Sequence, residues 1–249
     1  MAKYKSLFNV EGTLGEVTFY KNKDGYYIRS KGGVSKNRIL KDPAFARTRE
    51  NLSEFGNTAT SGKQLRRAIN SLLNDAKDSK VTSRLTKVLS MVKNEDGVSV
   101  RGQRMVATGL ATATGKAWLK GFNFNKNAVL DSVLQAQYSL DTTTGEVVIT
   151  DLVTSQQLAV PDGTTHVSFS SAFLNLDFTN DAKDLQVSPS VTLPIGVTAA
   201  TVILTPPTPA AGTGLNFYFL KAAFFQEVNG VQYPLNNGTF NALQLLEIL

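Results

Sequence analysis

The sequence of 249 residues contains no cysteine and only one histidine, His166. The absence of cysteine excludes disulfides, thiolate metal sites, iron–sulfur clusters and cysteine nucleophiles. A single histidine excludes histidine-rich metal sites and most familiar catalytic triads. No apolar run approaches the ~20 residues of a membrane-spanning helix, and none near the start has the length of a signal-peptide core. We therefore expect no membrane span and a location in the cytoplasm or in an assembled particle, with export by a non-classical route left open.

Charge is distributed unevenly along the chain, although the net charge is only +6. Residues 1–126 contain 24 Lys or Arg and 10 Asp or Glu, whereas residues 127–249 contain 2 and 10. Such a division indicates either that the basic half binds a polyanion or that it contacts the acidic half of a neighbouring subunit. Two solvated domains of unlike charge are the simpler alternative.

Residues 13–30 predict a β-hairpin, because two β-forming runs flank Asn22–Gly25 and glycine accepts the positive φ of a tight turn. Basic and tyrosine side chains alternate in this segment, a pattern that suits phosphate binding and base stacking. The other interpretation is an edge hairpin kept soluble by its lysines. Gly32-Gly33 ends this segment, so residues 1–33 are predicted to form an N-terminal arm.

Residues 34–126 are predicted to form a basic helical domain. Its helices are expected over 43–55, 60–77 and 82–93, with Asp42 as the first N-cap and Gly56 at the first C-terminus. The Gly-, Ala- and Thr-rich segment 97–126 is predicted to be a connector with one short helix.

Residues 127–249 consist of short β-rich runs separated by turn residues, which predicts an acidic, Ig-like antiparallel β-sandwich of about seven strands. The fold class is therefore α+β. The run 215–225 is apolar on both faces, which favours a central strand or a strand that contacts another domain or subunit. The candidate apolar contact residues in this run are Phe217, Phe219, Phe224 and Phe225.

No catalytic set stands out, so we predict a non-enzymatic protein with no cofactor and no metal. The stretches 56–63 and 109–116 resemble a phosphate-binding loop, but their glycines have the wrong spacing and no Ser or Thr follows the lysine. His166 is interpreted as a surface residue of a strand. A glycosidase built on two carboxylates of the β-rich part is the remaining enzymatic alternative, although nothing in the sequence singles out a pair.

The stretches GTLGEVTFYKNKDGYYIRSKGGVSKNRI and DPAFARTRENLSEFG resemble the opening of a family of uncharacterised proteins from the Bacteroidota. The resemblance covers the N-terminal part of the chain well and the β-rich part loosely. It implies a bacterial source or a mobile element in such bacteria. It implies no activity, cofactor or catalytic residue.

Two functional hypotheses follow. The first is a structural protein that self-assembles, as a subunit of a phage-like particle, tube or filament, by contact between basic and acidic parts of successive copies. The second is a nucleic-acid-binding protein that uses its basic half. The basic residues proposed for either contact are Lys21, Lys23, Arg29, Lys36, Arg38, Arg47, Arg49, Arg66 and Arg67.

Overall fold

The computed structural model describes residues 2–5, 8–30 and 32–249, apart from the side chains of residues 236 and 237. The chain divides into two compact units, Met1–Asn51 and Leu52–Leu249, which we call the first unit and the second unit. The division falls inside one helix. It does not coincide with the boundaries at residues 33 and 126 that the sequence suggested.

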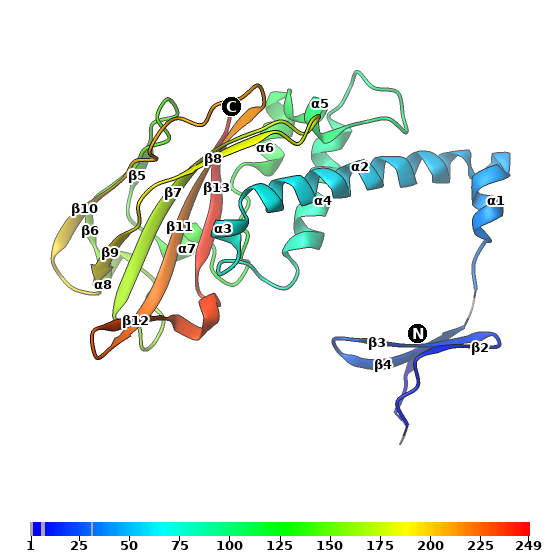
Figure 1. Cartoon of the computed structure of the whole chain (residues 1–249), viewed down its shortest axis with the longest axis horizontal. Helices are drawn as coiled ribbons and strands as arrows, with labels where there is room; N and C mark the ends of the chain where they lie inside the picture. Colours follow the sequence, from blue (N-terminus) through cyan, green and yellow to red (C-terminus); the bar gives the residue numbers. More distant parts are fainter. Residues whose placement is uncertain (1, 6–7, 31) are drawn as a thin grey trace. The chain divides into compact units, whose positions relative to one another are not determined.

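An antiparallel four-stranded sheet makes up most of the first unit, with its strands in the order β1-β4-β3-β2 (Figure 1). The strands are β1 (Ala2–Lys3), β2 (Gly12–Leu14), β3 (Val17–Asn22) and β4 (Gly25–Ser30). The predicted hairpin is confirmed, because β3 and β4 pair in register from Val17↔Ser30 to Asn22↔Gly25. Gly25 has a φ of +122° at the end of the turn, a conformation that only glycine adopts readily.

A helical segment follows the sheet. It consists of α1 (Lys36–Lys41), the 3₁₀ turn η1 (Pro43–Phe45) and the long helix α2 (Ala46–Ala68). The carboxylate of Asp42 accepts a hydrogen bond from the Ala44 amide, so the predicted cap forms, but on η1. The predicted helix end at Gly56 is wrong, because α2 continues through this glycine. Beyond it, Thr58 and Leu65 are buried, and this packing holds the helix together where local propensity favours a break.

The other helices belong to the second unit. They are α3 (Asn70–Leu73), α4 (Val81–Asn94), α5 (Val106–Leu110), α6 (Ala113–Leu119), α7 (Leu130–Val133) and α8 (Thr154–Gln157). Helix α4 confirms the helix predicted over 82–93. It begins at Val81 after Lys80, with no side chain capping its N-terminus.

The segment predicted as a connector is packed rather than loose. Val106, Leu110 and Leu119 are buried. A Cβ at Gly109 would lie 2.1 Å from the Val92 carbonyl oxygen, so α5 approaches α4 as closely as it does only because position 109 is glycine. The backbone of 121–124 also pairs with β13 (Ala242–Ile248), the last strand of the chain, through Gly121 N–H to Leu245 O at 2.8 Å.

The remaining strands form two antiparallel sheets. The larger sheet has the path β12-β11-β7-β8, with β13 paired to β11 and β9 paired to β7, and the smaller sheet has the order β10-β6-β5. Besides β13, the strands are β5 (Tyr138–Leu140), β6 (Val147–Val153), β7 (His166–Leu176), β8 (Lys183–Val187), β9 (Val191–Pro194), β10 (Ala199–Leu204), β11 (Leu215–Val228) and β12 (Val231–Pro234). A 3₁₀ turn, η2 (Leu235–Gly238), follows β12.

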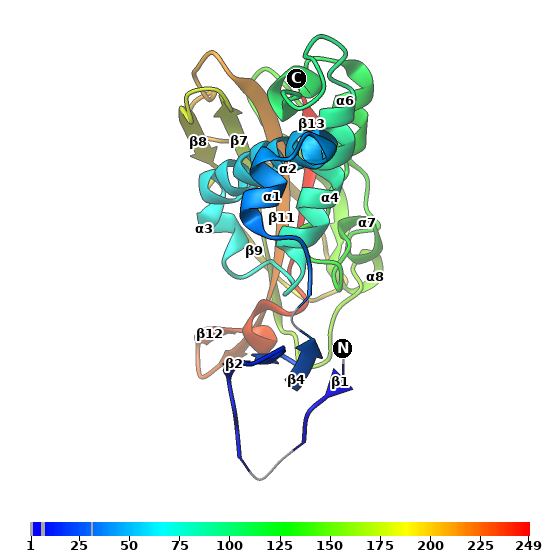
Figure 2. The ribbon, with the colours of Figure 1, turned by 90° about the vertical axis from the view of Figure 1, so that its right-hand side faces the viewer.

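The larger sheet lies between helices α2 to α6 on one side and the smaller sheet on the other (Figures 1 and 2). On one face, Leu174 and Phe219 share a core with Leu65 of α2 and with α4. On the opposite face, Phe173 and Tyr218 share a second core with the smaller sheet. The alternation of side chains along each strand therefore fills two cores. This confirms the interpretation of 215–225 as a central strand.

The fold mixes helices with antiparallel sheets, one of which curls into a half-barrel. The finer prediction, an Ig-like sandwich that forms its own domain over 127–249, is not confirmed. The helices of 52–126 and the strands of 127–249 share one core, and the backbone of 121–124 extends the larger sheet at β13. The β-rich part therefore belongs to the same unit as the helices.

Candidate functional site

The sheet of the first unit has an apolar face. The pairings Phe19↔Ile28 and Leu14↔Val17 bring apolar side chains to the same side of the sheet. Tyr4, after β1, packs edge-on against Phe19 at 5.2 Å between ring centroids. We call this the apolar sheet face.

The opposite face of the same sheet carries aromatic and basic groups. Tyr20 and Tyr27 stack with their ring centroids 5.9 Å apart, and the Arg29 guanidinium lies 5.5 Å from the Tyr20 ring. Lys21, on the apolar sheet face, lies 5.4 Å from the Tyr26 ring. The predicted interleaving of basic and tyrosine side chains is therefore present, divided between two faces.

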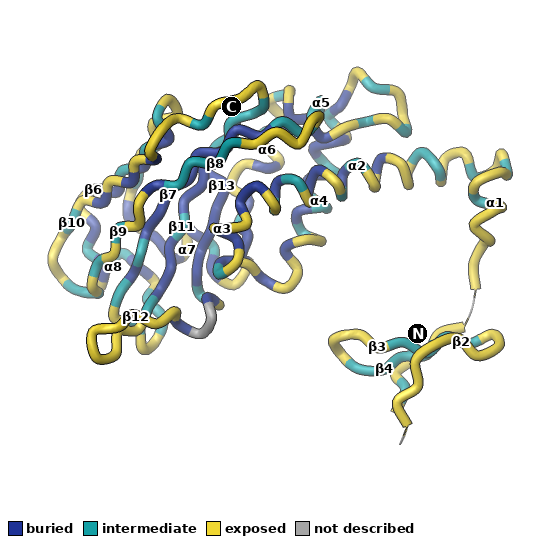
Figure 3. The backbone as a smooth tube through the Cα atoms, viewed as in Figure 1, coloured by how far each residue is buried: buried dark blue, intermediate teal, exposed yellow. Residues whose placement is uncertain are grey.

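No described residue of the first unit is buried, and Figure 3 draws its strands only in the intermediate and exposed colours. Leu14 on the apolar sheet face is 75% exposed. An antiparallel sheet normally packs one face on a core. Here no described residue of the same unit covers the apolar sheet face in this way.

Three of the predicted basic contact residues are held by their own helical segment. Arg38 pairs with Asp42 at 3.1 Å, and Arg47 pairs with Glu50 at 2.9 Å. The Arg49 guanidinium donates to the carbonyl oxygens of Ile39 and Asp42. These contacts give the three arginines a structural role in the turns around η1. Lys23 lies in the hairpin turn and Lys36 begins α1, both exposed.

Arg66 and Arg67 lie on α2 in the second unit, where they line a concavity of about 560 Å³. Two further cations, Lys63 of α2 and Lys77 after α3, line it as well, and its far side is formed by the start of α4. We call this concavity the basic groove. The structure thus brings together two of the nine predicted basic residues and adds two lysines that the prediction left out.

A second concavity of about 770 Å³ adjoins the basic groove, because Ser79 and Thr82 line both. It runs between α2 and α4 and exposes Phe55 and Met91. We call it the apolar groove. The Phe55 side chain is 61% exposed. The side chain of the neighbouring Glu54, and not that of Phe55, faces the core.

The predicted apolar contact residues do not form a surface. Phe217, Phe219 and Phe224 are 0%, 1% and 0% exposed inside the two cores of the second unit. Phe225 is half-buried, in register with His166 of β7. Since the chain itself covers both faces of β11, this prediction of a contact surface is wrong.

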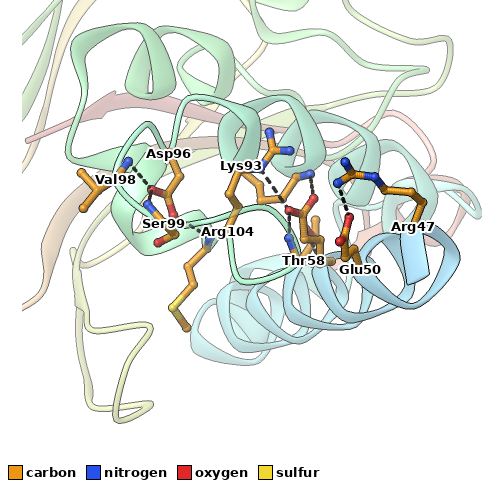
Figure 4. Close-up of polar contacts among 11 residues, drawn as sticks. Arg47, Glu50, Thr58, Lys93, Asp96, Val98, Ser99 and Arg104 are labelled. Carbon is orange, nitrogen blue, oxygen red and sulfur yellow. Dashed lines mark hydrogen bonds and ion pairs between the residues drawn. The ribbon is translucent and has the colours of Figure 1, made fainter. Parts of the chain in front are cut away.

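A buried ionic cluster anchors the loop between α4 and α5 (Figure 4). The Glu54 carboxylate pairs with the Lys93 ammonium, accepts the Gly102 amide at 2.8 Å and accepts Arg104 Nε at 3.0 Å. Burial raises the pKa of the Glu54 carboxyl, but the hydrogen bonds from Lys93 and Gly102 and the charges of Lys93 and Arg104 outweigh it and lower the pKa to about 2. This carboxylate therefore has a structural role.

Asp96 holds the same loop from its other end. Its carboxylate accepts hydrogen bonds from the amides of Val98, Ser99 and Met105 at 2.9 to 3.0 Å. Burial raises the pKa of this carboxyl. The hydrogen bonds from Ser99, Met105 and Val98 outweigh that effect and lower the pKa to about 2. Both anchors are ionised at neutral pH and turned toward the protein.

His166 stands at the start of β7, where Nδ1 lies 3.0 Å from the Thr165 hydroxyl and Nε2 lies 3.6 Å from a Glu227 carboxylate oxygen. Asp141 and Asp177, two carboxylates of the β-rich part, accept hydrogen bonds from the amides of Thr143 and Thr179 in turns. In the part of the chain that the structure describes, no three His, Asp or Glu residues gather in a way that would hold a metal ion.

Searches of known protein-family models, curated proteins and solved structures give no match to this chain. The resemblance to a Bacteroidota family therefore stays a prediction. Among the described residues, no helix is long and apolar enough to cross a membrane.

Proposed function

We propose that this protein is a non-enzymatic structural subunit that self-assembles, with the first unit of one copy docking on the second unit of another. The observation that carries the proposal is the apolar sheet face, which no described residue of the first unit covers. A small sheet in water needs a partner for such a face. A second copy supplies that partner without any further component.

Charge supports the choice of a second copy as the partner. Residues 1–51 contain 11 Lys or Arg and 5 Asp or Glu, whereas residues 127–249 contain 2 and 10. Opposite charges favour the encounter of these two surfaces and disfavour contact between like surfaces. A contact between unlike surfaces repeats from copy to copy, so the product is a ring, a tube or a filament, and the protein acts as part of an assembled particle.

Strand β12 is the docking surface that we assign to the neighbouring copy. It forms an end of the larger sheet, and its Val231 and Tyr233 are about half exposed. An end strand with exposed apolar side chains favours addition of strands or of another sheet face.

The test is size-exclusion chromatography with light scattering on the full chain at tens of micromolar, at low and at high salt. The wild-type protein should form oligomers that weaken as salt screens the charges. Phe19→Asp places a charge on the apolar sheet face and should give monomers. Thr18→Asp adds the same charge to the opposite face of the same strand and should leave the oligomers in place.

A wild-type monomer at every salt concentration would overturn the proposal. So would an equal loss of oligomers in both variants. Tyr233→Asp tests the assigned docking surface separately: oligomers that survive this change would move the contact away from β12 while leaving the role of the apolar sheet face intact.

A further inference from the structure

The basic groove concentrates positive charge that the protein does not neutralise. Within the described residues, the four cations that line it, Lys63, Arg66, Arg67 and Lys77, form no ion pair. Among the described residues, Arg66 is the one of the four whose side chain donates a hydrogen bond to the protein, from Nε to the Gly62 carbonyl oxygen at 3.1 Å. Four like charges around one concavity repel each other, and an anionic ligand relieves that repulsion.

The one carboxylate that lines the basic groove is already engaged. Asp78 pairs with Arg84 and accepts the amides of Lys80 at 2.6 Å and Lys126 at 3.0 Å. Burial raises the pKa of this carboxyl, while these amide hydrogen bonds and the Arg84 guanidinium lower it, with a net decrease. Its charge is therefore offset by its own partners, and the four cations keep their excess.

The start of α4 adds donors to the same concavity. Its N-cap, Lys80, provides no side-chain acceptor for the first turn, and the hydroxyls of Ser79 and Thr82 line the groove. The N-terminal amides of a helix favour an anion, most of all a phosphate. The N-terminus of α4 adds to the case for an anionic ligand, which rests on the four cations of the basic groove.

The adjoining apolar groove indicates that the ligand also carries apolar groups. It begins at Ser79 and Thr82, where the basic groove ends, and exposes the ring of Phe55 beside Met91. From Phe55 to Arg67, the two grooves follow α2 for about 18 Å at a rise of ~1.5 Å per residue. A ligand that matches both grooves carries phosphates along one part and planar apolar groups along the other.

We propose that the groove between α2 and α4 binds single-stranded nucleic acid, with phosphates at Lys63, Arg66, Arg67 and Lys77 and an unpaired base against Phe55. A single strand suits the site better than a duplex, because an aromatic side chain stacks only on a base whose face is open. The site is narrower than the nine-residue basic set that the sequence suggested. It is also independent of the self-assembly proposed above, which uses the first unit and β12.

The test is fluorescence anisotropy with the full-length protein and a labelled oligothymidylate of about 12 nucleotides, a length within the range of known single-strand sites. The affinity should fall as salt rises, with a slope of log K against log salt near −3, since each of four phosphates contributes ~0.7. Lys63→Ala with Arg67→Ala should weaken binding more than tenfold and reduce the slope by about 1.4.

The matched control is Lys116→Ala with Lys183→Ala, which removes the same charge from positions outside both grooves. This control should bind the oligonucleotide within about twofold of the wild type, because only local phosphate contacts change the slope. An equal loss in the two double variants would overturn the assigned site. Absence of oligothymidylate binding by the wild type at low salt would overturn the proposal. An effect of Lys63→Ala with Arg67→Ala on oligomerisation would not rescue it, because the proposal concerns nucleic-acid binding alone.

Phe55→Ala separates a nucleic acid from a simple polyanion. It should weaken oligothymidylate binding at least about fivefold, which corresponds to ~1 kcal/mol of base stacking, and leave binding of inorganic polyphosphate unchanged. If Phe55→Ala leaves both ligands unaffected, the groove is a phosphate site only and the nucleic-acid assignment is wrong. Tighter binding of a duplex of equal length would overturn the choice of a single strand.

Discussion

The two units use apolar side chains in opposite ways. In the first unit, Phe19 and Ile28 share one face of a regular sheet, yet neither is buried. In the second unit, both faces of β11 are covered, so that Phe217 and Phe224 are buried on opposite sides of one strand. Hydrogen-bonded strands therefore form in both units, but among the described residues only those of the second unit enclose an interior. We infer that the first unit gains its interior from another molecule.

Ion pairs show the same difference between the units. Arg47 and Glu50 in the first unit form a pair one helical turn apart, with the arginine largely exposed. In the second unit, Lys93 and Glu54 join α4 to α2 and are both buried. An exposed pair contributes little because water screens it, whereas a buried charge depends on its partner. The comparison therefore predicts unequal effects of similar substitutions.

Glu54→Gln is the substitution with the largest expected effect. It leaves the buried Lys93 ammonium without a counter-charge, and removal of one partner of a buried pair costs about 3 to 5 kcal/mol. Chemical denaturation followed by circular dichroism measures the change in the free energy of unfolding. As the matched change in the first unit, Arg47→Gln should cost at most about 1 kcal/mol. Equal costs would remove the distinction between the two kinds of pair.

The same experiment at lower pH sharpens this result. The pKa of Glu54 is about 2 in the folded protein, below its usual 4.5, and the pKa of Asp96 is also about 2. A lowered folded-state pKa contributes stability above the unfolded-state pKa, and this contribution is lost as the pH falls toward 2. The free energy of unfolding of the wild type should therefore decrease between pH 5 and pH 2. Glu54→Gln should show a smaller decrease.

Gly109→Ala tests how tightly the second unit is packed. The added Cβ would meet the Val92 carbonyl oxygen at 2.1 Å, so α5 has to move away from α4, at a cost of about 3 kcal/mol. Gly97→Ala is the control, because a Cβ at Gly97 meets no atom within 4 Å. The melting temperature of both variants measures the difference. If Gly109→Ala leaves the melting temperature unchanged, α5 packs less closely against α4 than the structure shows.

Local signals predicted those parts of the fold whose causes are local. The hairpin depends on the glycine at 25, and α4 depends on the spacing of Leu85, Leu89 and Val92. The helix end predicted at Gly56 is wrong because tertiary packing can carry a helix through a glycine. Here the buried face of α2 continues past Gly56 to Ala68. The sequence of 215–225 revealed a strand covered on both faces but not what covers it.

The candidate site was predictable only in part. Charge counting found Arg66 and Arg67 but weighted them equally with arginines that hold the turns around η1. Lys77 joins them through the turn between α3 and α4, a tertiary arrangement that has no local signal. The apolar sheet face likewise follows from the register of β2, β3 and β4, which alternation in a single strand leaves undetermined.

The smallest expected effect belongs to the first unit. Leu65→Ala removes a fully buried side chain from the core and should cost about 2 to 5 kcal/mol. Ile28→Ala removes an equally large side chain from the apolar sheet face, where no interior surrounds it, and should cost less than about 0.5 kcal/mol in dilute solution. Circular dichroism during denaturation reports both units and measures both costs. If Ile28→Ala in the monomer costs as much as Leu65→Ala, the apolar sheet face is already buried within one chain, and the reason for a second copy disappears.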